Sequence, residues 1–147
     1  MRRFLAASFG GLIAFALLAA PIPKALKKKS DEELLEGRWE IVTLDTSGAG
    51  PQAQNGDFGT FHFIYKAGVL STGTKTSPGW KDVKMTLDPT ANPKVMTLET
   101  SPGRFIKNIY EIDGDTLKWC EWQKESPPDN FTGGNGKNSF LLKRATE

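Results

Sequence analysis

The alternation of apolar and polar residues changes at Gly37 and then keeps a period of two almost to the end of the chain. A period of two places successive side chains on opposite faces of a strand, so this region predicts β-structure. Eight segments carry the pattern and are bounded by turn-forming residues. They are Arg38–Asp45, Asp57–Tyr65, Ala67–Thr72, Asp82–Asp88, Lys94–Thr100, Phe105–Asp113, Asp115–Gln123 and Lys137–Lys143. Short strands without a long helical pattern predict an all-β, antiparallel sandwich or barrel.

Glycine, proline and asparagine mark the connections between these segments. Pro102-Gly103 indicates a tight turn, because proline presets φ and glycine tolerates a positive φ. Asp113-Gly114 predicts a two-residue hairpin turn of type I′. Two longer stretches, Ser47–Gly56 and Glu125–Gly136, are predicted to be loops at one end or other of the sheet.

The apolar-rich face of each predicted strand is assigned to the interior. The segment Asp115–Gln123 carries a tryptophan on both faces, and we assign Leu117 and Trp119 inward and Trp122 outward. The resulting interior is aromatic. It contains Trp39, Phe61, Phe63, Tyr110 and Trp119. These side chains could form a filled core or line a cavity for a small ligand, and the alternation leaves both open.

The first twenty residues have the layout of a secretory signal peptide. Arg2 and Arg3 precede an apolar stretch that ends at Ala20, and small residues come before Pro21. The stretch from Phe4 to Ile22 is also about long enough to span a bilayer, so an uncleaved anchor is the alternative to residues 1–20 being removed. In both cases we expect an exported protein, either periplasmic or secreted, or held at the membrane by this segment.

Residues 21–36 form a charged leader, in which a run of lysines is followed by acidic residues. Ser30 and Glu33 have the spacing of a capping box and predict a short helix. Gly37 is expected to end that helix and to let the chain turn into the first strand of a domain that spans residues 37–145. Membrane contact is expected only through residues 1–29, if the signal segment is retained.

Charge and cysteine content exclude several classes of protein. The chain has 19 basic and 17 acidic residues, and removing Arg2 and Arg3 with the signal segment leaves 17 of each. A neutral domain gives no electrostatic reason to expect nucleic acid as a partner. The single cysteine, Cys120, cannot form an intrachain disulfide, so we expect a buried thiol and stability from packing, with intermolecular pairing as the alternative.

Candidate chemistry is sparse. His62 is the only histidine, so a catalytic triad or a histidine-rich metal site cannot be built within the chain. A hydrolase with paired carboxylates needs two inward acids, and Glu121 is the one candidate. We therefore predict that the protein is not an enzyme, and we predict no metal and no cofactor.

Four stretches resemble one group of bacterial proteins. They are Leu35–Trp39, Leu87–Lys94, Ile109–Lys118 with Cys120 after it, and Phe140–Arg144. On the strength of these stretches, residues 31–145 resemble the small lipocalin-like domains that occur in many copies in planctomycete bacteria. That family has no agreed activity. The resemblance implies an up-and-down, eight-stranded lipocalin-like barrel, preceded here by the signal helix and the leader helix.

The resemblance also implies structural roles for a few residues. In true lipocalins a basic residue near the C-terminus packs on the tryptophan of the Gly-x-Trp motif, here Gly37 and Trp39, and Arg144 or Lys143 could do so. Asp113 and Gly114 belong to the matching hairpin. Pro127 departs from the family pattern, because an arginine usually precedes the proline that matches Pro128, and the contact made by that arginine is absent or replaced.

Together these observations predict an exported, non-enzymatic, monomeric barrel that binds a small apolar or amphipathic ligand. The alternative is a structural or protein-interaction domain of the cell envelope with a filled core and no ligand. The interior aromatic residues are the candidate ligand-binding residues in the first case, and core residues in the second.

Overall fold

A computed structural model describes residues 28–53, 61–74, 79, 81–122, 124 and 126–146. The predicted signal segment 1–20, most of the leader and the start of the second predicted strand lie outside the described residues. The described part contains one helix and nine strands. They are α1 (Asp31–Leu35), β1 (Gly37–Asp45), β2 (Gln52–Ala53), β3 (His62–Lys66), β4 (Val69–Gly73), β5 (Val83–Asp88), β6 (Lys94–Ser101), β7 (Arg104–Asp113), β8 (Thr116–Trp122) and β9 (Lys137–Arg144).

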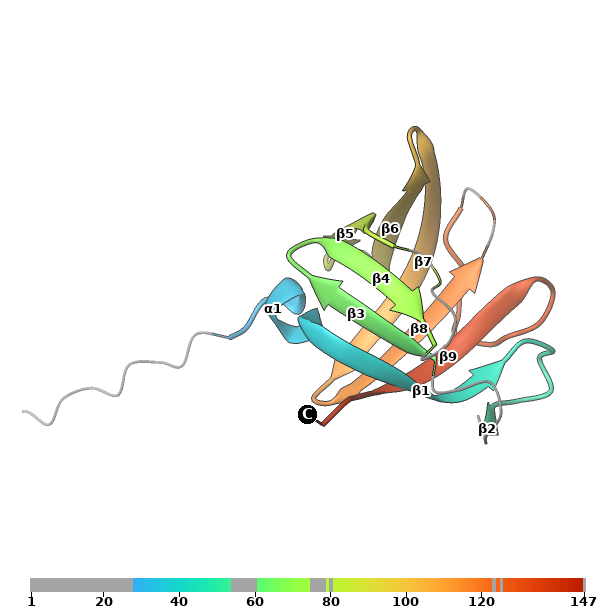
Figure 1. Ribbon diagram of the computed structural model, residues 1–147. Coiled ribbons are helices and arrows are strands. Elements are labelled where there is room, and N and C mark those ends of the chain that lie inside the picture. The colour runs from blue at the N-terminus through green and yellow to red at the C-terminus, as the bar shows by residue number, and fades with distance from the viewer. Residues whose placement is uncertain are drawn as a thin grey trace, which may run out of the picture.

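The strands form a closed antiparallel barrel (Figure 1). Each strand from β3 to β8 pairs with the next along the chain, and β1 pairs with both β3 and β9 to close the sheet. The eight predicted strands are therefore confirmed over their described parts, and of the two open alternatives the fold is a barrel. The short strand β2 was not predicted, and it pairs only with the end of β1, at Thr43 and Leu44.

Strand β1 carries the closure because it is paired along both edges. Its first residues pair with β3, and Trp39 to Asp45 pair with β9 through a bulge at Val42, between Ile41 and Thr43. A bulge adds a residue on one strand and increases the local bend, which a closed barrel needs. The bulge also keeps Ile41 and Leu44 on the same, inner face.

The β7–β8 hairpin has a different turn from the predicted one. Asp113 pairs with Thr116, so the central residues are Gly114 and Asp115. Gly114 has a φ of 56°, whereas Asp115 is not among the residues with positive φ. This is the φ pattern of a type II′ turn, and the type I′ prediction is wrong. The loop starts one residue later than predicted, which puts the glycine at the first central position.

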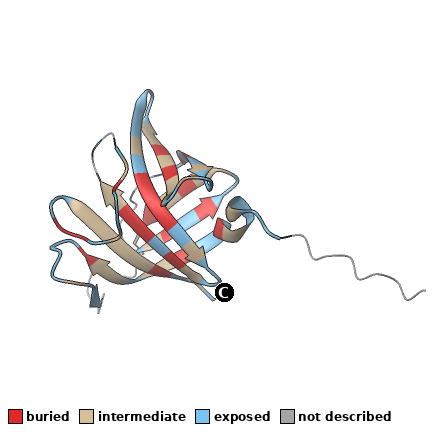
Figure 2. Cartoon of the chain, turned by 180° about the vertical axis from the view of Figure 1, so that it is seen from behind, coloured by how far each residue is buried: buried red, intermediate tan, exposed pale blue. Residues whose placement is uncertain are grey.

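The interior of the barrel is apolar, and the buried positions alternate along the strands (Figure 2). Each fully buried large apolar side chain of this kind stabilises the fold by about 1.5–3 kcal/mol. The interior cluster contains Leu35, Trp39, Phe63, Tyr65, Leu70, Val83, Met85, Met96, Leu98, Tyr110, Leu117, Trp119 and Leu142.

Cys120 lies outside this interior cluster. It is fully buried on the other face of β8, and Ile109 of β7, its partner in the register, is fully buried as well. Burial raises the pKa of the Cys120 thiol to about 11. The thiol is therefore protonated and poorly reactive at neutral pH. None of the described residues belongs to a helix that is long and apolar enough to cross a bilayer.

Candidate functional site

The two ends of the barrel are built differently. The helix end carries α1 and the short turns β3–β4, β5–β6 and β7–β8, and the C-terminus of the chain lies beside it (Figure 1). The loop end carries the longer connections after β1 and β8, together with the turn at Pro102 and Gly103. A ligand of the interior needs access at one of these two ends.

Helix α1 is short but well capped. The Ser30 hydroxyl accepts a hydrogen bond from the Glu33 amide at 3.2 Å, and the Glu33 carboxylate accepts one from the Ser30 amide at 2.7 Å. The predicted capping box is confirmed. Gly37 follows the C-cap residue Glu36 and has a φ of 118°, which only glycine adopts without strain. This conformation turns the chain sharply from the helix into β1.

Trp39 and Arg144 hold α1 against the barrel. The Trp39 indole donates to the Leu35 carbonyl at 2.8 Å, and the Arg144 guanidinium lies 4.3 Å from the centre of the Trp39 ring. The same guanidinium donates to the carbonyls of Glu36 at 2.6 Å and Leu34 at 2.5 Å. Of the two basic residues proposed for this contact, Arg144 makes it. The last carbonyls of a helix have no hydrogen-bond donor within the helix. Here Arg144, at the end of β9, supplies the donors.

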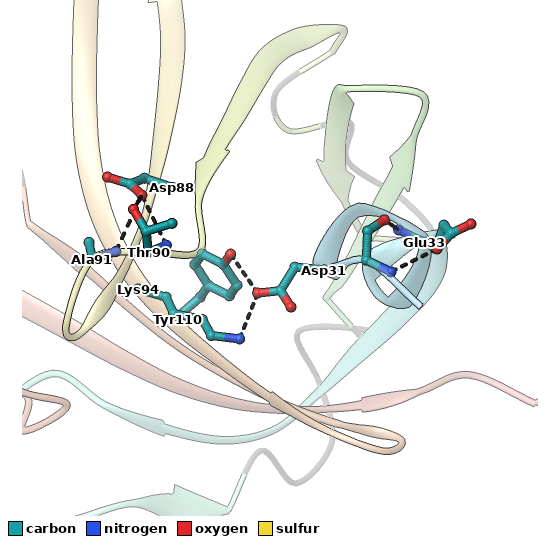
Figure 3. Close-up of polar contacts among 8 residues, drawn as sticks. Asp31, Glu33, Asp88, Thr90, Ala91, Lys94 and Tyr110 are labelled. Atoms are coloured by element: carbon teal, nitrogen blue, oxygen red, sulfur yellow. Dashed lines mark hydrogen bonds and ion pairs between the residues drawn. The ribbon is translucent and has the colours of Figure 1, made fainter. Parts of the chain in front are cut away.

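A second connection joins α1 to β6 and β7 (Figure 3). The Asp31 carboxylate accepts hydrogen bonds from the Lys94 ammonium at 2.7 Å and from the Tyr110 hydroxyl at 2.8 Å. Burial alone would raise the pKa of Asp31, but the bonds from Lys94 and Tyr110 outweigh it and hold that pKa below its usual value. Burial, reinforced by the bond to Asp31, raises the pKa of Tyr110.

Two of the five predicted lining residues therefore belong to the seal at the helix end. Trp39 and Tyr110 are each only 1% exposed, and their polar atoms bond to α1. Asp31 and Leu35, which make these contacts, were not predicted as partners, since nothing in a strand pattern indicates where a preceding helix will pack.

The middle of the interior is filled by aromatic rings that meet across the barrel. Phe63 on β3 and Trp119 on β8 lie 4.4 Å apart between ring centroids, although β1 and β9 separate their strands in the sheet. Phe140 of β9 joins them, 6.0 Å from Phe63 and 6.2 Å from Trp119. These distances are those of directly packed rings. Phe63 and Trp119 thus form a layer that closes the interior below the loop end.

Asn108 is the polar member of this layer and is completely buried. We assign its amide with the oxygen toward the Trp119 indole nitrogen at 3.1 Å and the nitrogen toward the Lys107 carbonyl at 3.2 Å. The indole N–H can only donate, so the atom that faces it must be an acceptor. Asn108 therefore fixes the tilt of Trp119.

Above this layer, the inner face is partly exposed at the loop end. Phe61 precedes β3 on the same face as Phe63, packs edge-on against it at 5.6 Å, and is 37% exposed. Leu44 and Phe140, which pair across β1 and β9, are half-buried. An apolar inner surface that is still in contact with solvent distinguishes this end from the sealed helix end.

Glu121 adds a carboxylate to the same inner surface. It follows Trp119 by two residues on β8 and pairs with Asn138 of β9, whose amide donates to it at 2.8 Å. Burial raises the pKa of Glu121, and the bond from Asn138 offsets this only in part. From the sequence, Glu121 was predicted only as a possible catalytic acid. Its spacing from Trp119 was the signal that it shares the inner face.

The loops around this end are held by Asp45. Its carboxylate accepts hydrogen bonds from the amides of Ser47 at 3.2 Å and Gly48 at 2.8 Å, and from that of Gly133 at 3.3 Å. A side chain at Gly133 would collide with the Asp45 backbone. The two predicted loops therefore lie at the same end and are tied together, so the rim above Glu121 and Phe140 is constrained.

His62 is not part of this surface. It pairs with Glu40 and Gly73 on the outer face of β3, and its Nδ1 is buried without a hydrogen-bond partner among the described residues. Within the described part of the chain, no three His, Cys, Asp or Glu side chains are grouped to hold a metal ion.

No family model, curated protein or solved structure was found to match this chain.

Proposed function

We propose that this protein is an exported, non-enzymatic, lipocalin-like barrel that binds a small apolar or amphipathic molecule at its loop end. The observation that carries the proposal is the partial exposure of Phe61, an aromatic residue on the inner face of the barrel. A side chain that only filled the core would be buried as Phe63 is. An inner aromatic surface in contact with solvent is what a small hydrophobic ligand would cover.

Three features of the barrel support this location. The helix end is closed by α1, which leaves the loop end as the route for a ligand. Phe63 and Trp119 supply a rigid base with Phe140 beside them, and Phe61 supplies an apolar wall next to Phe63. Asp45 holds the described loop residues Ser47, Gly48 and Gly133 in place, so a ligand would not have to order these residues on binding, which favours affinity.

The binding test uses N-phenyl-1-naphthylamine, a neutral fluorescent probe, and retinol as a second apolar ligand. We expect saturable binding that quenches the tryptophan emission, because Trp119 lies beneath the proposed site. Phe61→Ala should weaken binding by about fivefold or more, since it removes the apolar contact between the phenyl ring and the ligand. Phe105→Ala is the matched control, because Phe105 is 54% exposed on the outer face of β7. Absence of saturable binding by both probes contradicts the proposal.

A second candidate function is a structural or protein-interaction domain of the cell envelope. The direct contact between Phe63 and Trp119 favours it, because these rings fill the interior that a deep ligand cavity would need. In this case neither probe binds, and cross-linking in the native host recovers a specific envelope partner. N-terminal sequencing of the exported protein tests separately whether residues 1–20 are removed.

A further inference from the structure

Glu121 is a carboxylate on the inner surface of the loop end, and it has no cationic partner among the described residues. Its bond from Asn138 uses one of the roughly four acceptor positions of a carboxylate. No Lys, Arg or His among the described residues forms an ion pair with it. A partly buried carboxylate without an ion-pair partner is unusual, because burial of a charge is normally compensated by pairing with an opposite charge.

The basic residues nearest to Glu121 in the sheet are directed elsewhere. Lys118 on β8 pairs with Glu111, and Lys137 on β9 pairs with Asp129. Lys124, after β8, lies over the ring of Trp122 on the outer face. These three lysines are therefore held on the outside of the barrel, and none of the described residues forms an ion pair with the inner carboxylate.

The surroundings of Glu121 suit an organic cation better than a hydrated inorganic one. Trp119 lies two residues before Glu121 on the inner face of β8, and Phe140 lies two residues after Asn138 on the inner face of β9. These two rings pack at 6.2 Å from each other. Aromatic rings attract an ammonium group and also accept an alkyl chain, whereas a metal ion needs several oxygen ligands.

We propose that the loop end selects an amphipathic amine, with its ammonium group bonded to Glu121 beside Asn138 and its apolar part against Phe61 and Phe140. This inference rests on the proposed ligand-binding function and specifies the chemical class of the ligand. An ammonium group donates up to three hydrogen bonds, so it can fill the carboxylate positions that Asn138 leaves free. A fatty-acid carboxylate at the same place would meet a like charge.

The experiment compares three probes with the same alkyl chain: octylamine, octan-1-ol and octanoate. Binding to the purified barrel is measured by titration calorimetry and by tryptophan fluorescence near neutral pH. We expect octylamine to bind about tenfold or more tightly than octan-1-ol, and octanoate to bind most weakly, because a charge-assisted hydrogen bond is made only by the amine.

Two variants locate the effect. Glu121→Gln should remove the advantage of octylamine while octan-1-ol binds as before. Glu111→Gln, a change on the exposed face of the neighbouring strand, should alter neither. The comparison of the three probes on the unmodified protein needs no variant, so it holds even where Glu121→Gln does not fold.

The outcomes separate the two proposals. Equal binding of the three probes, or tighter binding of octanoate, overturns amine selection and leaves the ligand-binding function standing. Failure of all three probes, together with failure of N-phenyl-1-naphthylamine and retinol, overturns the ligand-binding function itself. An advantage for octylamine that persists in Glu121→Gln also contradicts the role of Glu121.

Discussion

The guanidinium of Arg144 lies over the ring of Trp39 and joins the last strand of the barrel to the first. The contact does more than pack two side chains, because both residues also bond to carbonyls around the end of α1. One cluster therefore closes the sheet, satisfies the helix end and seals one end of the interior.

Replacing Arg144 tests this seal. We expect Arg144→Ala to lower the free energy of unfolding by about 2–4 kcal/mol, because it removes a cation–π contact and leaves the carbonyls of Leu34 and Glu36 without donors. Chemical denaturation measures the change. Lys143→Ala is the control, since Lys143 is exposed on the outer face of the same strand, and it should stay within about 0.5 kcal/mol. Equal effects of the two substitutions would contradict the seal.

Asp31 predicts a dependence of stability on acidity. Its pKa in the folded protein lies below the usual value of 3.8, so its contribution to stability is fully present above that pH and is lost as the pH falls through the folded pKa. Asp31→Asn should therefore be less stable than the unmodified protein near pH 6, and the difference should shrink below about pH 4. Denaturation series between pH 2.5 and about 6 measure it. A difference that stays constant with pH would contradict the assignment.

Glu121 predicts the opposite trend. Its pKa is raised in the folded protein, so folding is disfavoured by its ionisation and the stability falls as the pH rises from the usual glutamate range through the raised value. Glu121→Gln should be more stable than the unmodified protein near neutral pH, and the gain should vanish in acid. Thermal unfolding at a series of pH values measures this. Glu111→Gln, on the exposed outer face, is expected to show no such gain.

Phe61 and Phe63 predict a separation of stability from binding. Phe63→Ala should destabilise the barrel by about 3–5 kcal/mol, because it leaves a cavity beside Trp119. Phe61→Ala should change stability by about 1 kcal/mol or less, since Phe61 is already partly exposed, yet it should weaken binding of N-phenyl-1-naphthylamine. Denaturation and fluorescence titration of the two variants give both quantities. A large loss of stability in Phe61→Ala would assign it to the core.

The strands could be predicted because their signals are local. Alternation sets the two faces of a strand, and proline and glycine set its ends, so all eight barrel strands were found within a few residues where they are described. Strand β2 was missed because two polar or small residues, Gln52 and Ala53, carry no alternation and pair only because β1 extends past β3. The turn at Gly114 was predicted wrongly because the turn type depends on which two residues are central. The prediction took Asp113 and Gly114, whereas the pairing makes Gly114 and Asp115 central.

The candidate site was predictable only in part, because alternation gives the face of a residue but not its height along the barrel. All three of Trp39, Phe63 and Phe61 face inward, yet Trp39 belongs to the seal at the helix end, Phe63 to the middle layer and Phe61 to the loop end. Their heights follow from strand tilt and register, which are set by pairing between distant segments. Glu121 meets Asn138 for the same reason.

The pairing of β1 with β9 also determines how the barrel responds to force. Residues at the start of β1 and the end of β9 are neighbours, with the Ala145 amide bonded to the Arg38 carbonyl at 2.9 Å. A pull applied at the start of β1 and the end of β9 loads this pair crosswise, so its backbone hydrogen bonds break one after another from the terminal pair onward. Arg144 and Trp39 stand at that starting point, so their contact resists the first step of separating the two strands.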